Sequence, residues 1–499
     1  MANMSHPLMN RREVVQLIGA AAAAQKLAAQ TPDICFLTAV EMAGLIRANK
    51  LSAREVMAAH LKQIERVNPQ VNAIVTLVAE QATEKARQAD ESQARGTLLG
   101  PLHGLPVVHK DLFETAGIRT TFGSRIFKDN VPKRDAIIVE RINGAGAICV
   151  GKSNTPEFGA GSQTFNEVFG VTKNPYDLTK TCGGSSGGAA VSLACGMVPI
   201  ADGSDSGGSL RNPASFCNVV GIRVAPGRVP AHAQGNAWLT IAVQGPMART
   251  VSDLALVLSV IAGPDPRCPI SITEQGSLFA GNLERGFKGA RVAWFKNMGG
   301  IPFDPQVINL VNAQRKVFED LGCMVEEAEP DWTGAHEGYD ILRAWNYAST
   351  QSDNVRLHRS LVKDTIQWEV ERGSKLTGAD IARAHSLRSA AWDRMRVFNE
   401  KYDYFIAPTS QVLPYDLKQP YPTEIEGVKM STYVEWQKSC ILISSLENPS
   451  ISVPCGFTAQ GLPVGLQIVG RHRDELSVLQ MAFAFEQGTR VARRKPAIA

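Results

Sequence analysis

Hydrophobic residues along this chain follow two patterns that predict different elements. After Ser52, residues Met57, Leu61 and Ile64 recur three or four positions apart, which predicts a helix with one buried face. From position 105 onward, brief apolar runs bounded by glycine alternate with helical or turn segments, and buried strands have this pattern. These runs lie at 105–108, 147–150, 198–200, 450–453 and 464–469, and a last helix is predicted from Asp474. Strands that alternate with helices predict an α/β fold, with a largely parallel or mixed sheet covered on both faces.

Polar residues mark two helix starts in the N-terminal part. Thr38 with Glu41, and Ser52 with Glu55, have the spacing of a capping box. In a capping box, the hydroxyl and the carboxylate bond amides that a helix start leaves unpaired. His60 lies near the apolar face of the second helix, and we predict a packed histidine there rather than a ligand.

The middle of the chain differs from the rest in its tryptophan content. All seven tryptophans fall between positions 238 and 436. The indole rings either fill the core of an inserted helical layer or line a substrate pocket. For any single tryptophan we favour the core. The strand-like runs after position 450 complete the first sheet. We therefore predict one domain over residues 35–495, with a variable substrate-pocket region inserted at roughly 265–440.

Composition narrows the class of protein. Apolar residues make up 44% of the 499 residues and charged residues 20%, which is ordinary for a soluble globular protein. A formal charge of +4 is too small and too scattered to indicate a nucleic-acid partner. The nine cysteines include no Cys-x-x-Cys pair. We therefore predict buried structural thiols, with no disulfide framework and no metal site.

The N-terminal segment, residues 1–34, allows two interpretations. Arg11 and Arg12 precede an apolar stretch with five consecutive alanines, as in a twin-arginine signal for export to the periplasm. The alternative is an alanine-rich, flexible helix ahead of the domain of a cytoplasmic protein. Polar residues interrupt the apolar stretch, which is shorter than the about 20 residues of a membrane span, so no span is predicted.

Two familiar motifs occur without the context that they need. Segment 146–153 matches the phosphate-loop pattern, but its interior is an apolar strand and Pro156 stands where a helix should begin. Segment 183–187 matches the nucleophile elbow of α/β-hydrolases, which needs a downstream histidine. None of the downstream histidines lies in a setting that indicates catalysis. We expect neither nucleotide binding nor a histidine-based serine hydrolase.

Two serines set among glycines, together with one lysine, can make a nucleophile without histidine. Ser185 lies in Gly-Gly-Ser-Ser-Gly-Gly, Ser209 lies in Asp-Ser-Gly-Gly-Ser, and Lys110 follows an apolar strand-like run. A serine reacts only when a base takes its proton, and lysine is a base only when neutral. Full burial lowers a lysine pKa from about 10.4 by up to about 3–5 units. The alternative is a surface lysine paired with Asp111.

The glycines beside Ser209 favour an oxyanion hole. Glycine lets the backbone bend where a Cβ would clash, so the amides of Ser206, Gly207, Gly208 and Ser209 can converge on one point. Convergent N–H donors stabilise the oxyanion of a tetrahedral intermediate. The other serine, Ser185, can then relay a proton between the nucleophile and the lysine.

The block from Gly183 to Pro230 carries the most specific pattern in the chain. It contains Gly-Gly-Ser-Ser-Gly-Gly, Asp-Ser-Gly-Gly-Ser-Leu-Arg-Asn-Pro-Ala-Ser, Val-Val-Gly-Ile-Arg and Gly-Arg-Val-Pro. This block resembles the amidase signature family, as do segments 100–111, 151–158 and 461–467. The resemblance spans roughly positions 36–490.

The resemblance implies a single α/β/α domain with a mixed central sheet, and a Ser–cis-Ser–Lys triad. By matching motif, Ser209 is the nucleophile, Ser185 the relay and Lys110 the base, and the peptide bond between Gly184 and Ser185 is cis. Supporting positions in the same motifs are Ser186, Asp205 and Arg211. The resemblance implies no metal and no cofactor.

The function implied by the resemblance is hydrolysis of an amide, carbamate or ester bond of a small molecule through a seryl acyl-enzyme. The protein would act as a monomer or homodimer, and the tryptophan-rich middle slightly favours a hydrophobic acyl or aryl group. One alternative is the glutamine-dependent amidotransferase subunit of a tRNA-amidating complex. Another is a catalytically silent binding scaffold, against which the intact triad argues.

Three residues depart from the family pattern, and one of them is Val224, which stands where relatives often have proline. His109 stands before the lysine, where many relatives have a small apolar residue, and its polar ring either tunes the lysine or faces a neighbouring layer. Glu447 stands where many relatives carry a glycine, so the shape of that loop is open.

Overall fold

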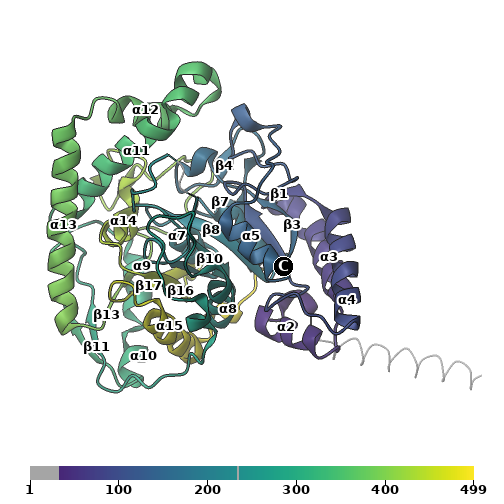
Figure 1. Cartoon of the computed structure of the whole chain (residues 1–499). Coiled ribbons are helices and arrows are strands. Elements are labelled where there is room, and N and C mark those ends of the chain that lie inside the picture. Colours follow the sequence, from purple (N-terminus) through teal and green to yellow (C-terminus); the bar gives the residue numbers. More distant parts are fainter. Residues whose placement is uncertain (1–32, 233–234) are drawn as a thin grey trace, which may run out of the picture.

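An eleven-stranded mixed sheet runs through the molecule, with helices on both faces (Figure 1). The computed structural model describes residues 33–232 and 235–499. The stretch of the N-terminal segment that we interpret as either an export signal or a flexible helix lies outside the described residues. The architecture confirms the predicted α/β/α fold. Within the described ranges, no helix is long and apolar enough to cross a membrane.

The sheet combines strands from both ends of the chain. From edge to edge the strands are β1 (Ile74–Leu77), β3 (Ile148–Ser153), β2 (Pro106–Lys110), β8 (Ile200–Asp205), β10 (Val243–Ala248), β9 (Val220–Arg223), β16 (Ser450–Phe457), β17 (Pro463–Val469), β13 (Tyr404–Pro408), β11 (Arg291–Trp294) and β12 (Met324–Glu327). β2 pairs in parallel with β3 and β8, and β11 pairs in parallel with β12 and β13. The other neighbours are antiparallel. Four of the five predicted runs lie in strands, whereas the run 198–200 reaches β8 only at Ile200. Strands β16 and β17 complete the sheet beside β9 as expected.

Three short strand pairs lie outside the main sheet. They are β4 (Phe165–Asn166) with β5 (Gly170–Val171), β6 (Lys173–Asn174) with β7 (Asp177–Thr181), and β14 (Glu424–Ile425) with β15 (Val428–Lys429).

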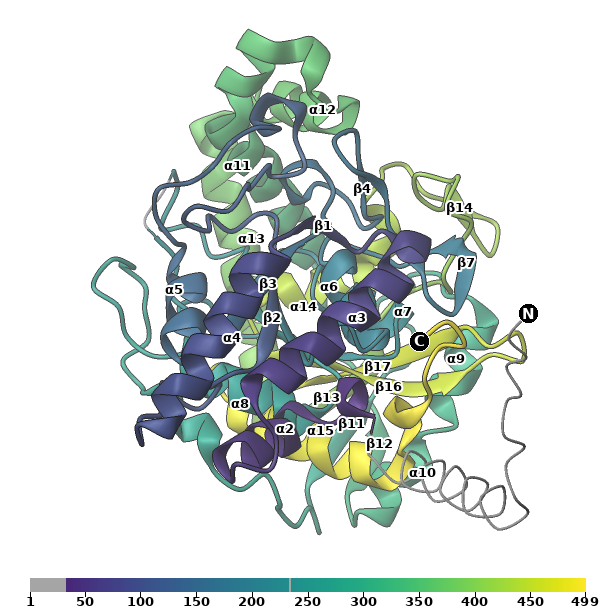
Figure 2. The same ribbon diagram turned by 90° about the vertical axis from the view of Figure 1, so that its right-hand side faces the viewer.

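Helices cover both faces because successive strand residues point to opposite sides. On β2, Val107 belongs to one hydrophobic cluster and Val108 to another, and neither side chain is exposed. In Figure 2, α3 and α4 lie in front of the sheet. The helices are α2 (Ala39–Arg47), α3 (Ala53–Val71), α4 (Ala79–Ala94), α5 (Ile137–Gly144), α6 (Gly187–Ala194), α7 (Arg211–Phe216), α8 (Val251–Ile261), α9 (Pro305–Asn312), α10 (Arg315–Asp320), α11 (Ala335–His358), α12 (Asp364–Gly373), α13 (Gly378–Lys401), α14 (Lys438–Ser445) and α15 (Glu475–Thr489).

The local signals at the N-terminal helices are confirmed. Thr38 caps α2 and Ser52 caps α3, each in a complete capping box with the predicted glutamate. His60 is fully buried and packs between elements, with Nδ1 3.0 Å from the carbonyl oxygen of Gly196. All nine cysteines are buried free thiols.

The middle region both extends the sheet and adds a helical layer. Strands β11, β12 and β13 lie inside the predicted insert of roughly 265–440, so the part that stands away from the sheet narrows to α11, α12 and α13 (Figure 1). α11 packs against α12, α13 and α14. This layer brings α11 over the carboxyl end of β8, where the serine motifs meet.

Candidate active site

Lys110 ends β2, and its amine is surrounded by serine hydroxyl groups. Its side chain is fully buried, and Nζ lies 2.8 Å from Oγ of Ser185, 2.8 Å from Oγ of Ser186 and 3.1 Å from Oγ of Ser204. No carboxylate forms an ion pair with this lysine in the described part of the chain. The predicted buried lysine is therefore found, and the surface pairing of Lys110 with Asp111 is not.

Burial lowers the pKa of Lys110 to about 7, although the carboxylates of Asp205 and Asp202 act in the opposite direction. Removal from water destabilises the ammonium form, and this effect is larger than the stabilisation of that form by the two carboxylates. A large fraction of Lys110 is consequently proton-free near neutral pH. This is the condition that a lysine base requires.

Ser185 and Ser209 lie on two different loops, and the described contacts join only Ser185 to the lysine. Ser185 precedes α6 and follows Gly184 through a cis peptide bond, as the family resemblance implies. Ser209 follows β8 and is half-buried, and its carbonyl oxygen accepts the amide of Ser186 at 3.2 Å. Ser185 and Ser209 both line a cavity of about 250 Å³. The two serine motifs thus contribute to one site.

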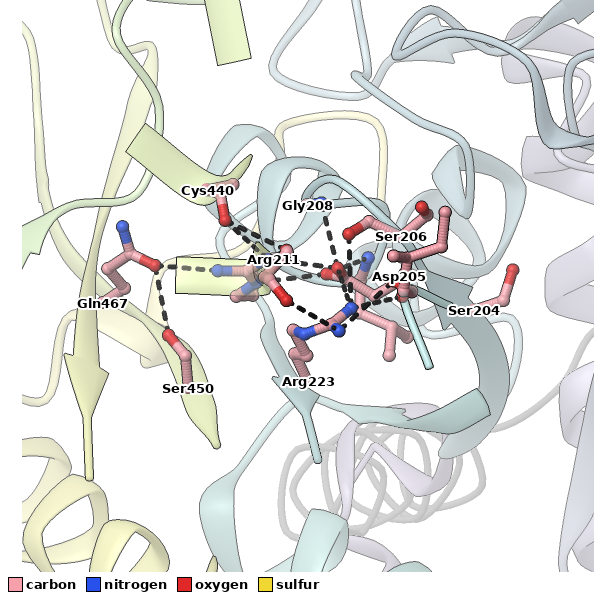
Figure 3. Close-up of polar contacts among 12 residues, drawn as sticks. Ser204, Asp205, Ser206, Gly208, Arg211, Arg223, Cys440, Ser450 and Gln467 are labelled. Atoms are coloured by element: carbon pink, nitrogen blue, oxygen red, sulfur yellow. Dashed lines mark hydrogen bonds and ion pairs between the residues drawn. The ribbon is translucent and has the colours of Figure 1, made fainter. Parts of the chain in front are cut away.

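Asp205 holds the Ser209 loop through a buried ionic cluster (Figure 3). Its carboxylate contacts the guanidinium groups of Arg211 at 3.1 Å and Arg223 at 3.3 Å, and all three side chains are fully buried. Burial alone would raise the pKa of Asp205, but the two guanidinium groups hold it well below its usual range. The same carboxylate accepts the backbone amides of Gly208 at 2.9 Å and Leu210 at 3.1 Å.

These contacts correct one part of the predicted oxyanion hole. The amide of Gly208 donates to Asp205 and is not free to hold an oxyanion. Ser206, Gly207 and Ser209 line the cavity, whereas Gly208 does not. The carboxylate of Asp205, at the start of the turn, takes the amide three residues later. The sequence motif does not show which amides of the turn are taken in this way.

We predict that Asp205→Asn destabilises the fold as well as the site. The substitution leaves two buried guanidinium groups without their carboxylate, and breaking a buried pair in this way costs about 3–5 kcal/mol. The free energy of unfolding, measured by urea titration, should fall by this amount. Asp353→Asn removes an exposed partner of Arg356 and should leave it nearly unchanged. Equal effects of the two substitutions would contradict a structural role for the Asp205 cluster.

One wall of the cavity is a polar stripe on α11. Tyr339, Arg343 and Tyr347 lie four residues apart and therefore share a helix face, and Asn346, Thr350 and Gln351 extend it. The hydroxyl groups of Tyr339 and Ser206 lie 2.9 Å apart. The cavity is also lined by apolar residues, namely Leu112, Phe158, Ile241, Val434 and Ile441.

Arg343 is the charged residue of this wall. Nε donates to Glu369 at 2.9 Å and Nη2 donates to the hydroxyl of Tyr433 at 2.6 Å, while the ring of Tyr347 lies 4.9 Å from the guanidinium carbon. Sequence reasoning missed Tyr339, Arg343 and Ser204. The four-residue spacing of Tyr339 and Arg343, which places both on one face of a helix, could have indicated a shared polar face.

The tryptophans do not form the pocket. None of the seven is among the cavity-lining residues. Trp436 is buried in the core beside Phe216, whereas Trp238 is 72% exposed. The interpretation that indole rings cover the serines is therefore wrong, and the apolar side of the cavity comes from aliphatic residues and one phenylalanine.

Glu447 keeps its loop in the shape that a glycine would allow. Its φ of +62° lies in the left-handed region, which most side chains avoid. The carboxylate bonds Nη2 of Arg388 at 2.6 Å and also accepts the hydroxyl of Thr240. These contacts to α13 and to the segment before β10 compensate for the unfavourable backbone conformation.

No cluster of three or more metal-ligating side chains occurs within residues 33–232 and 235–499. Segment 146–153 leads into and forms the strand β3, with no α-helix directly after it, so the phosphate-loop resemblance has no structural counterpart.

Comparisons with known proteins agree on one family. The sequence profile described as Amidase matches residues 55–479. An acylamidase from Rhodococcus erythropolis is 37% identical over 93% of this chain and 98% of its own length. A glutamyl-tRNA(Gln) amidotransferase subunit from Moorella thermoacetica is 37% identical over 93% of this chain and 99% of its own length.

A solved structure agrees with the sequence relatives. A bacterial aryl acylamidase of the amidase signature enzymes superposes with a TM-score of 0.85 at 29% identity, over 91% of this chain and 96% of that one. The profile match, the full-length relatives and the shared fold all point the same way: this chain belongs to the amidase signature family.

Proposed function

We propose that this amidase cleaves carboxylic amides through a seryl acyl-enzyme, with Ser209 as nucleophile, Ser185 as proton relay and Lys110 as base. The observation that carries the proposal is the enclosed contact of 2.8 Å between Nζ of Lys110 and Oγ of Ser185, in the same cavity as Ser209. A buried amine with a pKa near 7 can take a proton that a surface lysine would refuse.

The three hydroxyl neighbours of Nζ fit a neutral amine. A neutral lysine offers two N–H donors and one lone pair, whereas an ammonium offers three donors. The two N–H groups can donate to Ser186 and Ser204, and the lone pair then accepts the hydroxyl proton of Ser185. Ser185 Oγ is in turn left to accept the proton of the nucleophile.

The reaction follows from this arrangement. Ser209 Oγ attacks the carbonyl carbon while its proton passes to Ser185, whose own proton passes to Lys110. The carbonyl oxygen becomes an oxyanion, for which the amides of Ser206, Gly207 and Ser209 are the donors we assign. The proton returns by the same path to the leaving amine, the C–N bond breaks, and water then releases the acid from Ser209.

The cavity favours small acyl or aryl amides. Its volume of about 250 Å³ and its partly apolar lining fit a compact acyl group better than a long alkyl chain. The acylamidase and aryl acylamidase relatives support the same class. Purified full-length protein should hydrolyse acyl p-nitroanilides faster than long-chain fatty amides or carbamates. Absence of hydrolysis of every amide, together with no labelling of Ser209 by a fluorophosphonate, would overturn the proposal.

A role in a tRNA-amidating complex is the second candidate, supported by the amidotransferase relatives. Glutamine should then be hydrolysed only after partner subunits are added. Glutamine hydrolysis by the isolated chain, or anilide hydrolysis without partners, would favour the free-standing amidase.

A further inference from the structure

His109 directly precedes Lys110 on β2 and faces the other side of the sheet. Side chains alternate along a strand, so His109 lies on the side of Val107 and Lys110 on the side of Val108. His109 is fully buried, and its Nδ1 lies 2.5 Å from Oδ2 of Asp202 on β8. The imidazole therefore does not reach the substrate, but it touches a charge that does influence the lysine.

Asp202 connects the imidazole to Lys110. Its Oδ2 faces His109, and its Oδ1 accepts the backbone amide of Lys110 at 2.7 Å. The carboxylate is fully buried and favours the ammonium form of the lysine. Left uncompensated, this carboxylate would oppose the proton-free state that a base needs.

Both nitrogens of His109 face oxygen atoms. Nε2 lies 3.3 Å from Oδ1 of Asn143 on α5, opposite to the contact of Nδ1 with Asp202. A neutral imidazole can donate from one nitrogen only, whereas an imidazolium donates from both. An imidazolium at this position would donate to both oxygen atoms at once, to the carboxylate of Asp202 and to the side chain of Asn143.

The other titratable groups around Lys110 have different partners. Asp205 is held by Arg211 and Arg223, and Asp111 accepts the amide and hydroxyl of Thr121. On β3, Lys152 donates to Thr115 and to the carbonyl of Phe113, and Cys149 is a buried thiol whose pKa is raised to about 11 by burial. Among these groups, His109 is therefore the one that can balance the negative charge of Asp202 at hydrogen-bond distance.

We propose that His109 is a positioning residue whose charge offsets Asp202 behind the sheet and so keeps Lys110 available as a base at neutral pH. The proposal rests on the role of Lys110 given above. In this proposal, Lys110 receives its proton on one face of β2. The His109–Asp202 pair lies on the other face and changes the electrostatic environment of the lysine.

The test measures how fast a fluorophosphonate labels Ser209 across pH 5 to 10, which needs no knowledge of the natural substrate. In the wild type, labelling should rise with pH as Lys110 loses its proton. His109→Gln removes the charge and leaves Asp202 uncompensated, so the rise should move to higher pH by about one unit, a tenfold slower reaction on the acid side. His358→Gln, at an exposed site on α11, should leave the profile in place.

The double variant His109→Gln with Asp202→Asn separates charge from shape. It removes both members of the pair, and the rise should return to within about 0.3 of a pH unit of the wild type. A His109→Gln profile that is lowered evenly without a shift, or a shift that persists in the double variant, would overturn the proposal. If wild-type labelling shows no rise with pH at all, the assignment of Lys110 as base fails instead.

Discussion

Replacing Ser209 by alanine should abolish amide hydrolysis while the protein remains folded. The nucleophile is lost, and in a serine hydrolase this loss can lower kcat by about 10⁶-fold. Because Ser209 is half-buried and its side chain bonds no other described residue, the thermal midpoint should stay within a few degrees. Initial rates on an acyl p-nitroanilide and a thermal melt, measured on the same preparation, check both parts.

Two neighbouring serines are matched controls for Ser209→Ala. Ser206→Ala removes a hydroxyl that contacts Tyr339 but leaves its backbone amide in place, so the loss should be modest. Ser185→Ala should cost more than Ser206→Ala and less than Ser209→Ala, because water can replace a proton relay but not a nucleophile. Comparable activity of Ser209→Ala and the wild type would show that the acyl group is carried elsewhere.

Replacing Lys110 by methionine should lower kcat/KM by about 10²- to 10⁴-fold, the usual contribution of a positioned base. The wild-type rate should rise through a pH of about 7, where Lys110 loses its proton. The variant should lack this rise, and its residual activity should begin only at higher pH. A pH–rate profile from 5 to 10 distinguishes this outcome from a uniform loss.

The same substitution should stabilise the fold near neutral pH. The pKa of Lys110 is about 7 in the folded protein and about 10.4 in an unfolded chain. Between these values the unfolded chain binds a proton that the folded one does not, so wild-type stability rises with pH in this window. Methionine removes that dependence, and its melting temperature at pH 7 should equal or exceed that of the wild type. A less stable variant with no change in pH profile would argue that Lys110 is structural.

The strands and helix starts were predictable from the sequence because their signals are local. Short apolar runs between glycines indicated β2, β3, β16 and β17, and the two capping boxes indicated α2 and α3. The three residues that we assign to the triad were found because each lies in a distinctive motif.

The environment of these residues was not predictable, because it depends on contacts between distant segments. Arg343 lines the cavity because α11 is folded beside the serine loops. Asp202 and His109 are in contact although 93 positions separate them in the sequence. The use of the Gly208 amide by Asp205 depends on the turn geometry, which the motif does not encode. The pocket role considered for tryptophan failed for a related reason, since enrichment in one region does not say which way a side chain points.

The position of Gln467 on β17 has a consequence for protein synthesis. Arg211, which holds Asp205 beside the Ser209 loop, itself depends on Gln467 at 3.0 Å and on Ser444 at 2.7 Å. A ribosome therefore completes Lys110, Ser185 and Ser209 long before it makes the residues that lock their loop. We therefore expect the Ser209 loop of the growing chain to stay unassembled until the last strands have been translated.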